Sequence, residues 1–316
     1  MQTRQIGKTP LKVSTVGLGC NNFGLRMDVD AAQPVIHRAL DLGITFFDTA
    51  DVYGNPAQKG GSETALGKYF GARRKDIVIA TKFGSPMDSS GKMQGASRRY
   101  MMSAVEASLK RLNTDWIDIY QLHRFDETTP LEETLRAFDD LIRQGKIRYA
   151  GISSVSGWRL ADLQWTARQL GSHSLTTCEV EYSLLARDPE RELIPAMKAH
   201  DAVLLPYYPL ASGLLTGKYQ RNASNPGTRL ANDARYQAMF MTDANWTRIE
   251  KLTVFCQQRG RTLLELAFSW LAAQPIVACV IAGATRPEQL EANVKATDWA
   301  LSTDELREID RITKAV

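Results

Sequence analysis

Three short apolar runs of this sequence each end in side chains that can exchange a proton or carry charge. The first run is followed by Asp48 and then by Tyr53, the second stops at Lys82, and the third stops at His123. Runs rich in β-branched and aromatic residues are typical of strands. If the three strands are parallel neighbours, the four side chains emerge at one edge of a sheet, where α/β enzymes carry their active sites.

The types of these four residues are those needed for proton transfer. An ammonium at the end of a buried strand must find a carboxylate or lose its proton, and Asp48 is the predicted partner of Lys82. A positive neighbour lowers the pKa of a phenol, so Tyr53 is predicted to act as a general acid. His123 is predicted to orient the oxygen of a substrate. Taken singly, each residue also has a structural interpretation, in which Asp48 caps a turn, Tyr53 and His123 pack, and Lys82 is solvated.

The composition is that of a globular protein, with 44% hydrophobic and 23% charged residues. The net charge of +4 is spread over 39 basic and 35 acidic side chains, so no nucleic-acid or membrane partner is expected. No segment reaches the roughly 18 apolar residues of a membrane span. The four cysteines are far apart, which favours reduced thiols and a cytoplasmic enzyme. No H-E-x-x-H or C-x-x-C motif is present, so no metal site is expected.

Strand-like and helix-like stretches alternate along the whole chain. We predict strands near Val16–Gly19, Thr45–Asp48, Ile77–Lys82, Trp116–Leu122, Tyr149–Ser153, Cys178–Glu181, Val203–Pro206 and Val280–Ala282. Helical periodicity falls at Val29–Leu42, Ser62–Phe70, Ser97–Leu112, Leu131–Arg143, Trp158–Leu170, Arg191–Ala199, Trp246–Arg259 with Leu263–Ala273, and Pro287–Ala296. Eight strands, each followed by helix, predict a single α/β domain over residues 1–316 that forms a (β/α)₈ TIM barrel.

Three further segments complete the predicted architecture. Residues Gln5–Val13 contain Gly-Lys-Thr-Pro between two alternating runs, which predicts a β-hairpin that plugs one end of the barrel. The long irregular stretch Ala211–Asn245 follows the seventh strand, and a loop of this length in a compact domain is usually functional. Ser302–Lys314 is predicted to be an extra C-terminal helix.

With these residues and elements in place, the sequence resembles the aldo-keto reductase family, nearest its bacterial and potassium-channel-β-like branch. The matching segments run in family order over nearly the whole chain: DTADVYG (48–54), GGSETALG (60–67), ATKFG (80–84), LNTDWIDIYQLHRFD (112–126), GKIRYAGIS (145–153), EYSLL (181–185), YYPLASGLLTGKY (207–219) and GATRPEQLEANVKA (283–296). The resemblance implies an NADPH-dependent oxidoreductase that reduces aldehyde or ketone carbonyls of small molecules, with Asp48, Tyr53, Lys82 and His123 as its catalytic tetrad. The alternative is a cofactor-sensing regulatory or binding subunit on the same barrel, and the oligomeric state stays open.

The resemblance also implies where NADPH binds. Ser153 matches the serine that holds the nicotinamide carboxamide, and Tyr207 matches the aromatic residue that stacks on the ring. The pyrophosphate is expected at the segment after the seventh strand, held by backbone groups around Leu210, Gly213 and Leu214 together with Lys218 and Arg229. The adenine and its 2′-phosphate are expected at a helix start that carries Arg286, Gln289 and Asn293.

Three cofactor positions depart from the family pattern. Ser154 stands where asparagine is usual, Glu179 where glutamine is usual, and Gly283 where many members carry a lysine. An ionised Glu179 near the nicotinamide favours its positive oxidised form, whereas burial can instead raise the pKa of Glu179 and leave a neutral acid that resembles glutamine. Aromatic residues expected near the substrate, Phe23, Phe125 and Tyr208, indicate a partly apolar carbonyl compound.

Overall fold

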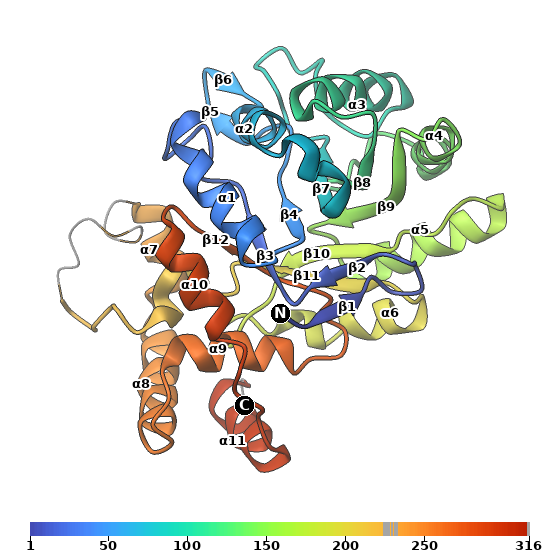
Figure 1. Cartoon of the computed structure of the whole chain (residues 1–316). Helices are drawn as coiled ribbons and strands as arrows, with labels where there is room; N and C mark the ends of the chain where they lie inside the picture. Colours follow the sequence, from blue (N-terminus) through green and yellow to red (C-terminus); the bar gives the residue numbers. More distant parts are fainter. Residues whose placement is uncertain (224–227, 229, 231–232, 315–316) are drawn as a thin grey trace.

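The centre of the computed structural model is an eight-stranded parallel sheet, and the structure describes residues 1–223, 228, 230 and 233–314 (Figure 1). In spatial order the strands are β11 (Val203–Tyr207), β10 (Thr177–Glu181), β9 (Ile147–Ser153), β8 (Ile117–Leu122), β7 (Val78–Phe83), β4 (Phe46–Asp48), β3 (Val16–Gly19) and β12 (Val280–Gly283). The sheet closes where Leu204 donates to the Ile276 carbonyl at 2.8 Å and accepts from the Ala278 amide at 3.1 Å. The predicted (β/α)₈ barrel is therefore confirmed.

The helices lie outside the barrel and follow the strands in sequence (Figure 1). They are α1 (Gln33–Asp41), α2 (Gly61–Tyr69), α3 (Arg98–Leu112), α4 (Leu131–Arg143), α5 (Gly157–Leu170), α6 (Leu193–Ala199), α7 (Ala234–Phe240), α8 (Asp243–Gln257), α9 (Leu263–Ala272), α10 (Pro287–Lys295) and α11 (Thr303–Thr313). Short 3₁₀ turns are η1 (Asp30–Ala32), η2 (Gly71–Asp76), η3 (Asp188–Glu190) and η4 (Ala211–Thr216). Among the described residues, none of these helices is long and apolar enough to cross a membrane.

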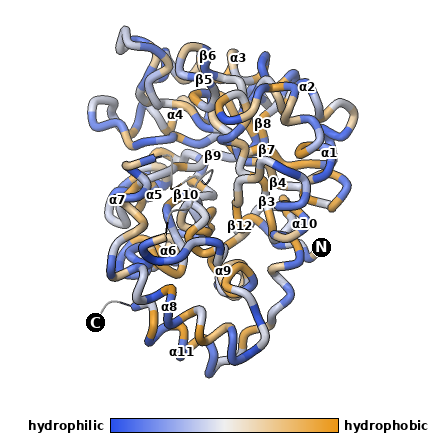
Figure 2. Tube along the Cα trace, turned by 90° about the vertical axis from the view of Figure 1, so that its left-hand side faces the viewer, coloured by the Kyte–Doolittle hydropathy of each residue, from blue (hydrophilic) through white to orange (hydrophobic). Residues whose placement is uncertain are grey.

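The barrel strands are buried on both faces, which explains their continuous apolar sequence. All six residues of β7 and all six of β8 are buried. Figure 2 shows hydrophobic residues gathered along the central strands, whereas the outer helices alternate between hydrophobic and hydrophilic residues. Helix α4 begins at Leu131 and ends at Arg143, as predicted, with Glu132 and Glu133 in its first turn, where the positive end of the helix dipole favours acidic residues.

A β-hairpin plugs the N-terminal end of the barrel, as the sequence predicts. Its strands β1 (Thr3–Gln5) and β2 (Lys12–Ser14) pair antiparallel. Ile6 and Val13 from this hairpin are fully buried in a small core with strand residues that include Phe46 and Leu205. This plug closes the end of the barrel that lies opposite the carboxyl ends of the strands.

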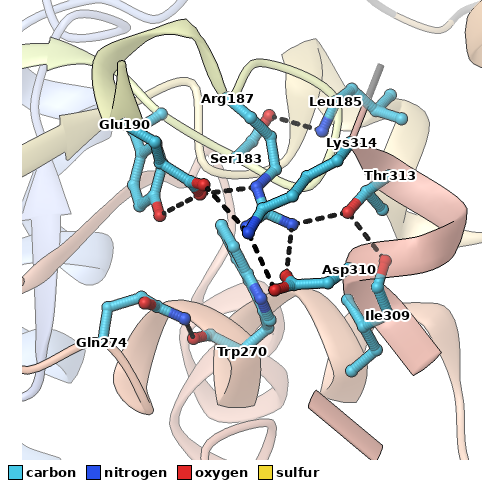
Figure 3. Close-up of polar contacts among 11 residues, drawn as sticks. Ser183, Leu185, Arg187, Glu190, Trp270, Gln274, Ile309, Asp310, Thr313 and Lys314 are labelled. Carbon is cyan, nitrogen blue, oxygen red and sulfur yellow. Dashed lines mark hydrogen bonds and ion pairs between the residues drawn. The ribbon is translucent and has the colours of Figure 1, made fainter. Parts of the chain in front are cut away.

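The C-terminal helix α11 is fixed to the segment that follows β10 by a cluster around Arg187 (Figure 3). The Arg187 guanidinium donates to Glu190 at 2.5 Å, to Asp310 at 2.8 Å and to Thr313 at 2.6 Å. It also lies over the ring of Trp270, 4.7 Å from the ring centroid. The predicted extra helix is thus confirmed, and the side of the guanidinium that lacks a carboxylate is covered by an aromatic ring.

Two segments differ from the sequence-based expectation. The stretch Ala211–Asn245 is not wholly irregular, because it contains η4 and helix α7. Asp233 caps α7 by accepting from the amides of Arg235 and Tyr236, so an N-cap signal was present but was followed by only seven helical residues. A second short hairpin, β5 (Gly54–Asn55) with β6 (Gln58–Lys59), follows Tyr53 and was not predicted.

Candidate active site

The four side chains with which the sequence analysis began gather at the carboxyl ends of β4, β7 and β8. Asp48 ends β4, Lys82 lies near the end of β7, and His123 directly follows β8. The ladder continues past the strands, because the Asp51 amide donates to the Lys82 carbonyl at 2.9 Å. This bond fixes the start of the loop that carries Tyr53. The rings of Tyr53 and His123 meet edge to face with centroids 5.8 Å apart.

The Lys82 ammonium is fully buried and has three acceptors. It donates to Asp48 Oδ1 at 2.6 Å and to the Thr49 carbonyl at 3.0 Å. Glu179 Oε2 lies 3.2 Å from the same nitrogen. Coulombic attraction to Asp48 and Glu179 raises the pKa of Lys82 against the opposing effect of burial, so the ammonium stays charged.

Tyr53 differs from its predicted protonation behaviour. Its ring lies beside the ammonium, with Lys82 Nζ 5.3 Å from the ring centroid. Lys82 lowers the pKa of Tyr53 as predicted, but burial acts more strongly, and Asp48 and Glu179 add to it, so the net pKa is raised. The prediction of a lowered pKa is therefore wrong, because loss of solvation outweighs one positive neighbour.

His123 is neutral at physiological pH. Burial, followed by the positive charges of Lys82 and Arg124, lowers the pKa of His123 to about 3. Its buried Nδ1 has no hydrogen-bond partner among the described residues. A neutral imidazole can orient an uncharged oxygen by donating an N–H.

Ser153, Ser154 and Tyr207 lie together at the carboxyl ends of β9 and β11. The hydroxyls of the two serines are 3.3 Å apart. Tyr207 is half-buried, and burial raises its pKa while a hydrogen bond with the Ser154 side chain lowers it. Ser154 adopts a left-handed φ of 55°, a conformation that asparagine tolerates better than serine.

Glu179 has two polar partners inside the barrel. Its carboxylate is turned into the barrel, where it contacts Lys82 and accepts from Gln121 Nε2 at 2.8 Å. Gln121 is held in that orientation because its Oε1 accepts from the Thr177 hydroxyl at 2.9 Å. Gln121 was missed in the sequence analysis. Its position two residues before His123, on a largely apolar strand, was the signal that could have identified it as a buried polar residue.

The segment after β11 has features suited to an anion. Ser212 and Gly213 both adopt left-handed backbone conformations, with φ of 56° and 99°. The Ser212 hydroxyl is buried with no partner among the described residues. The exposed Lys218 lies against Gly213, where a Cβ atom would come within 3.5 Å of Nζ. A left-handed turn that carries an orphaned hydroxyl and lies against an ammonium at Gly213 fits a phosphate group.

The other residues predicted to hold the pyrophosphate have different surroundings. Leu214 is buried in the core, Leu210 is half-buried, and the Gly213 amide donates to the Leu210 carbonyl at 2.8 Å. Leu214 can therefore offer a ligand only its backbone groups, whereas Lys218 provides an exposed ammonium. Arg229 lies outside the described residues.

The start of α10 provides the remaining predicted positions. Arg286 is the exposed residue before the helix, and no described residue forms an ion pair with it. Gln289 is turned back, since its Oε1 accepts from the Thr285 amide at 2.7 Å. Asn293 is buried, and Gly283 is exposed at the end of β12. Arg286 is therefore the side chain at this end of the site that is available to an anionic ligand.

Comparison with known proteins identifies the family of this chain. A sequence model described as the aldo/keto reductase family matches residues 15–314. The chain belongs to the aldo/keto reductase family. It is therefore an oxidoreductase of a family that reduces carbonyl compounds with a nicotinamide cofactor.

Relatives cover almost the whole chain. An uncharacterized oxidoreductase of Bacillus subtilis, YrpG, is 36% identical over 99% of this chain and 96% of its own length. The L-glyceraldehyde 3-phosphate reductase of Escherichia coli K12 is 35% identical over 98% of this chain and 92% of its own length. A probable voltage-gated potassium channel subunit beta of Arabidopsis thaliana is 36% identical over 94% of this chain and 92% of its own length. Both branches named in the sequence analysis are therefore represented among the relatives.

A second buried cluster lies behind the tetrad and was not foreseen. Glu63 of α2 is fully buried and pairs with Arg111 of α3 at 2.7 Å. Asp51, also buried, accepts a long contact of 3.5 Å from the Tyr100 hydroxyl, and its Oδ1 has no hydrogen-bond partner among the described residues. Burial, and then the Glu63 carboxylate, raise the pKa of Asp51 to about 8.

This raised pKa makes stability depend on pH. The folded state keeps a proton on Asp51 that the unfolded chain gives up near pH 4, so the stability from that proton is present below about pH 4 and lost as the pH rises to about 8. We expect Asp51→Asn to be more stable than the parent at pH 8 by as much as about 5 kcal/mol, at about 1.4 kcal/mol per pKa unit. Urea unfolding at pH 5 and pH 8 checks this. A stability difference that is the same at both pH values would contradict it.

Proposed function

We propose that this chain reduces aldehyde or ketone carbonyls to alcohols with NADPH, and that Tyr53 is the general acid. The observation that carries the proposal is the buried contact of 2.6 Å between Lys82 and Asp48 beside Tyr53 and His123. A bound nicotinamide supplies hydride to the carbonyl carbon. The protein must then deliver a proton to the carbonyl oxygen and stabilise the charge that develops there.

The protonation states of the site residues support this division of labour. A raised pKa keeps the Tyr53 phenol protonated at neutral pH, which is the form that a general acid needs. Lys82 stabilises the phenolate that remains after transfer, and Asp48 holds Lys82 in place. The neutral His123 can donate to the carbonyl oxygen and position it between the two rings.

The residues that would hold the cofactor follow from the same geometry. Ser153 and Tyr207 lie next to the tetrad and would hold the nicotinamide end. Ser212 and Lys218 would contact the pyrophosphate, and Arg286 would contact the 2′-phosphate of NADPH. We also propose a cytoplasmic location, because the four cysteines are buried free thiols.

Arg286→Ala is expected to reduce the preference for NADPH over NADH. A charge-assisted bond between a guanidinium and a phosphate is worth about 1.5–3 kcal/mol, so the ratio of the two dissociation constants should change about tenfold or more. Fluorescence titration of both cofactors measures this ratio. The matched control is Lys295→Ala, which removes an exposed positive charge at the far end of the same helix. If the ratio of the two dissociation constants is the same in Arg286→Ala and the parent, another group recognises the 2′-phosphate.

The substrate side of the site has an aromatic wall. The hydroxyls of Tyr208 and Tyr236 lie 2.9 Å apart, and the rings of Tyr236 and Phe240 stack with their centroids 6.2 Å apart. Tyr208 is close enough to Tyr53 to act on its pKa. A wall of this kind suits a partly apolar carbonyl compound, so a panel of aliphatic and aromatic aldehydes and ketones, followed by NADPH absorbance, tests the proposed activity.

A second candidate is a cofactor-sensing subunit of a larger assembly. It is favoured by the name of the Arabidopsis relative, a probable potassium channel subunit beta. The two candidates differ in turnover. Repeated consumption of NADPH by the purified chain with a simple aldehyde supports the enzyme, whereas tight cofactor binding without turnover supports the sensor.

A further inference from the structure

Glu179 is a second acidic partner of the lysine in the tetrad. Its Oε2 lies 3.2 Å from Lys82 Nζ, on the ammonium that Asp48 contacts at 2.6 Å. Gln121 fixes the same oxygen with a bond of 2.8 Å. All three charged side chains are at most 5% exposed, so water screens none of these contacts.

The cluster holds more acidic groups than basic ones. The titratable groups that face Glu179 from the surrounding elements are Asp48 on β4, Tyr53 in the next loop, Lys82 on β7, Tyr207 on β11 and Cys178 on β10 itself. The phenols and the thiol are neutral, since burial raises the pKa of each. With both carboxylates ionised, the buried cluster would carry a net charge of −1.

Such an excess charge is costly in a dry interior, so it is removed by binding a proton. Burial first, and Glu179 second, raise the pKa of Asp48 well above its ordinary value, in agreement with the geometry. Two carboxylates that share one site behave as a pair, and the proton belongs to the pair and not to one residue.

We propose that Asp48 and Glu179 share one proton around Lys82, and that the pair releases this proton to solvent when the positively charged oxidised nicotinamide binds beside it. The site of release follows from the sheet register, in which Glu179 pairs with Ser153 on β9 and with Leu205 on β11, two residues before Tyr207. The release step rests on the proposed function, whereas the shared proton does not.

The release step predicts different proton counts for the two cofactor forms. The neutral reduced ring does not stabilise the ionised form of the pair, so NADPH should bind without releasing this proton. For NADP⁺, loss of one proton makes the association constant rise up to tenfold per pH unit. The 2′-phosphate titrates in both forms, so its contribution cancels when the two are compared.

The test measures protons released on binding, by calorimetry in two buffers with different ionisation enthalpies, for the parent and Glu179→Gln. In the parent, we expect NADP⁺ binding to release about one more proton than NADPH binding. In Glu179→Gln, whose cluster carries no excess charge, we expect the two cofactors to release equal numbers of protons. Equal proton counts for NADP⁺ and NADPH in the parent would overturn the release step.

A second arm uses no cofactor and therefore separates this proposal from the proposed function. A proton held only in the folded state stabilises the protein below about pH 4, and that stability is lost as the pH rises towards the raised pKa of Asp48. Glu179→Gln should therefore gain stability relative to the parent between pH 5 and pH 8. The control is Asp118→Asn, which removes a buried carboxylate paired with Arg74 at 2.8 Å and should destabilise at both pH values.

The two arms fail in different ways. If Glu179→Gln loses stability at pH 8 as Asp118→Asn does, the Glu179 carboxylate balances the charge of Lys82 and the shared proton is excluded. If the unfolding result holds but neither cofactor binds, the shared proton stands, while the release step and the proposed reductase activity fail.

Discussion

Tyr53→Phe is expected to lower kcat for aldehyde reduction by about 10²–10⁴, the usual worth of a general acid. The substitution removes only the hydroxyl, so the ring keeps its edge-to-face contact with His123 and its place beside Lys82. Cofactor affinity should therefore stay within a factor of a few of the parent value. Steady-state kinetics and a fluorescence titration of NADPH measure the two effects separately.

The matched control is Tyr120→Phe. Tyr120 is also buried in the barrel, but it stacks on Phe83 and its hydroxyl has no hydrogen-bond partner among the described residues. Removing that hydroxyl leaves no group unsatisfied, so activity should be unchanged. If Tyr53→Phe retains kcat within a factor of a few, Tyr53 is not the proton donor.

Lys82→Met is expected to cause the largest loss of stability. It leaves the carboxylates of Asp48 and Glu179 buried together without a cation, and removing one partner of a buried ion pair costs about 3–5 kcal/mol. The loss should be greater at pH 8 than at pH 5, because at the lower pH the carboxylates can take up protons. Urea unfolding at both pH values measures it.

Asp48→Asn in the Lys82→Met background provides the control. It removes one of the two carboxyl groups left without a cation, so the double variant should recover part of the lost stability at pH 8. An unfolding free energy of Lys82→Met equal to that of the parent at pH 8 would show that the cluster does not depend on the ammonium.

Local sequence signals were sufficient to predict the barrel fold. The strand at Val16–Gly19 and the helix at Leu131–Arg143 have the bounds that were predicted, because each has a continuous apolar or amphipathic pattern with clear ends. That Asp48, Lys82 and His123 lie close together could be predicted for a related reason, since parallel strands bring their carboxyl ends to one edge. Helix α7 was missed because only a short helical run follows its cap.

The charge states of the site could not be predicted from residue types. The pKa of Tyr53 depends on how completely the barrel removes water, and that is a property of packing from many elements. The resemblance indicated Glu179 as a cofactor residue, but it did not reveal its contacts with Gln121 and Lys82 inside the barrel. Both contacts join residues from different strands, so no local pattern contains them.

The most direct test of the central claim follows a label from the cofactor to the product. NADPH carrying deuterium at C4 is incubated with the purified chain and an aldehyde, and the alcohol is analysed by mass spectrometry and NMR. We expect one deuterium at the carbinol carbon, transferred from one face of the ring only, at a rate that falls about 10²–10⁴-fold in Tyr53→Phe. NADPH consumption without deuterium in the alcohol, or no alcohol from any aldehyde or ketone of the panel, would contradict hydride transfer by this site.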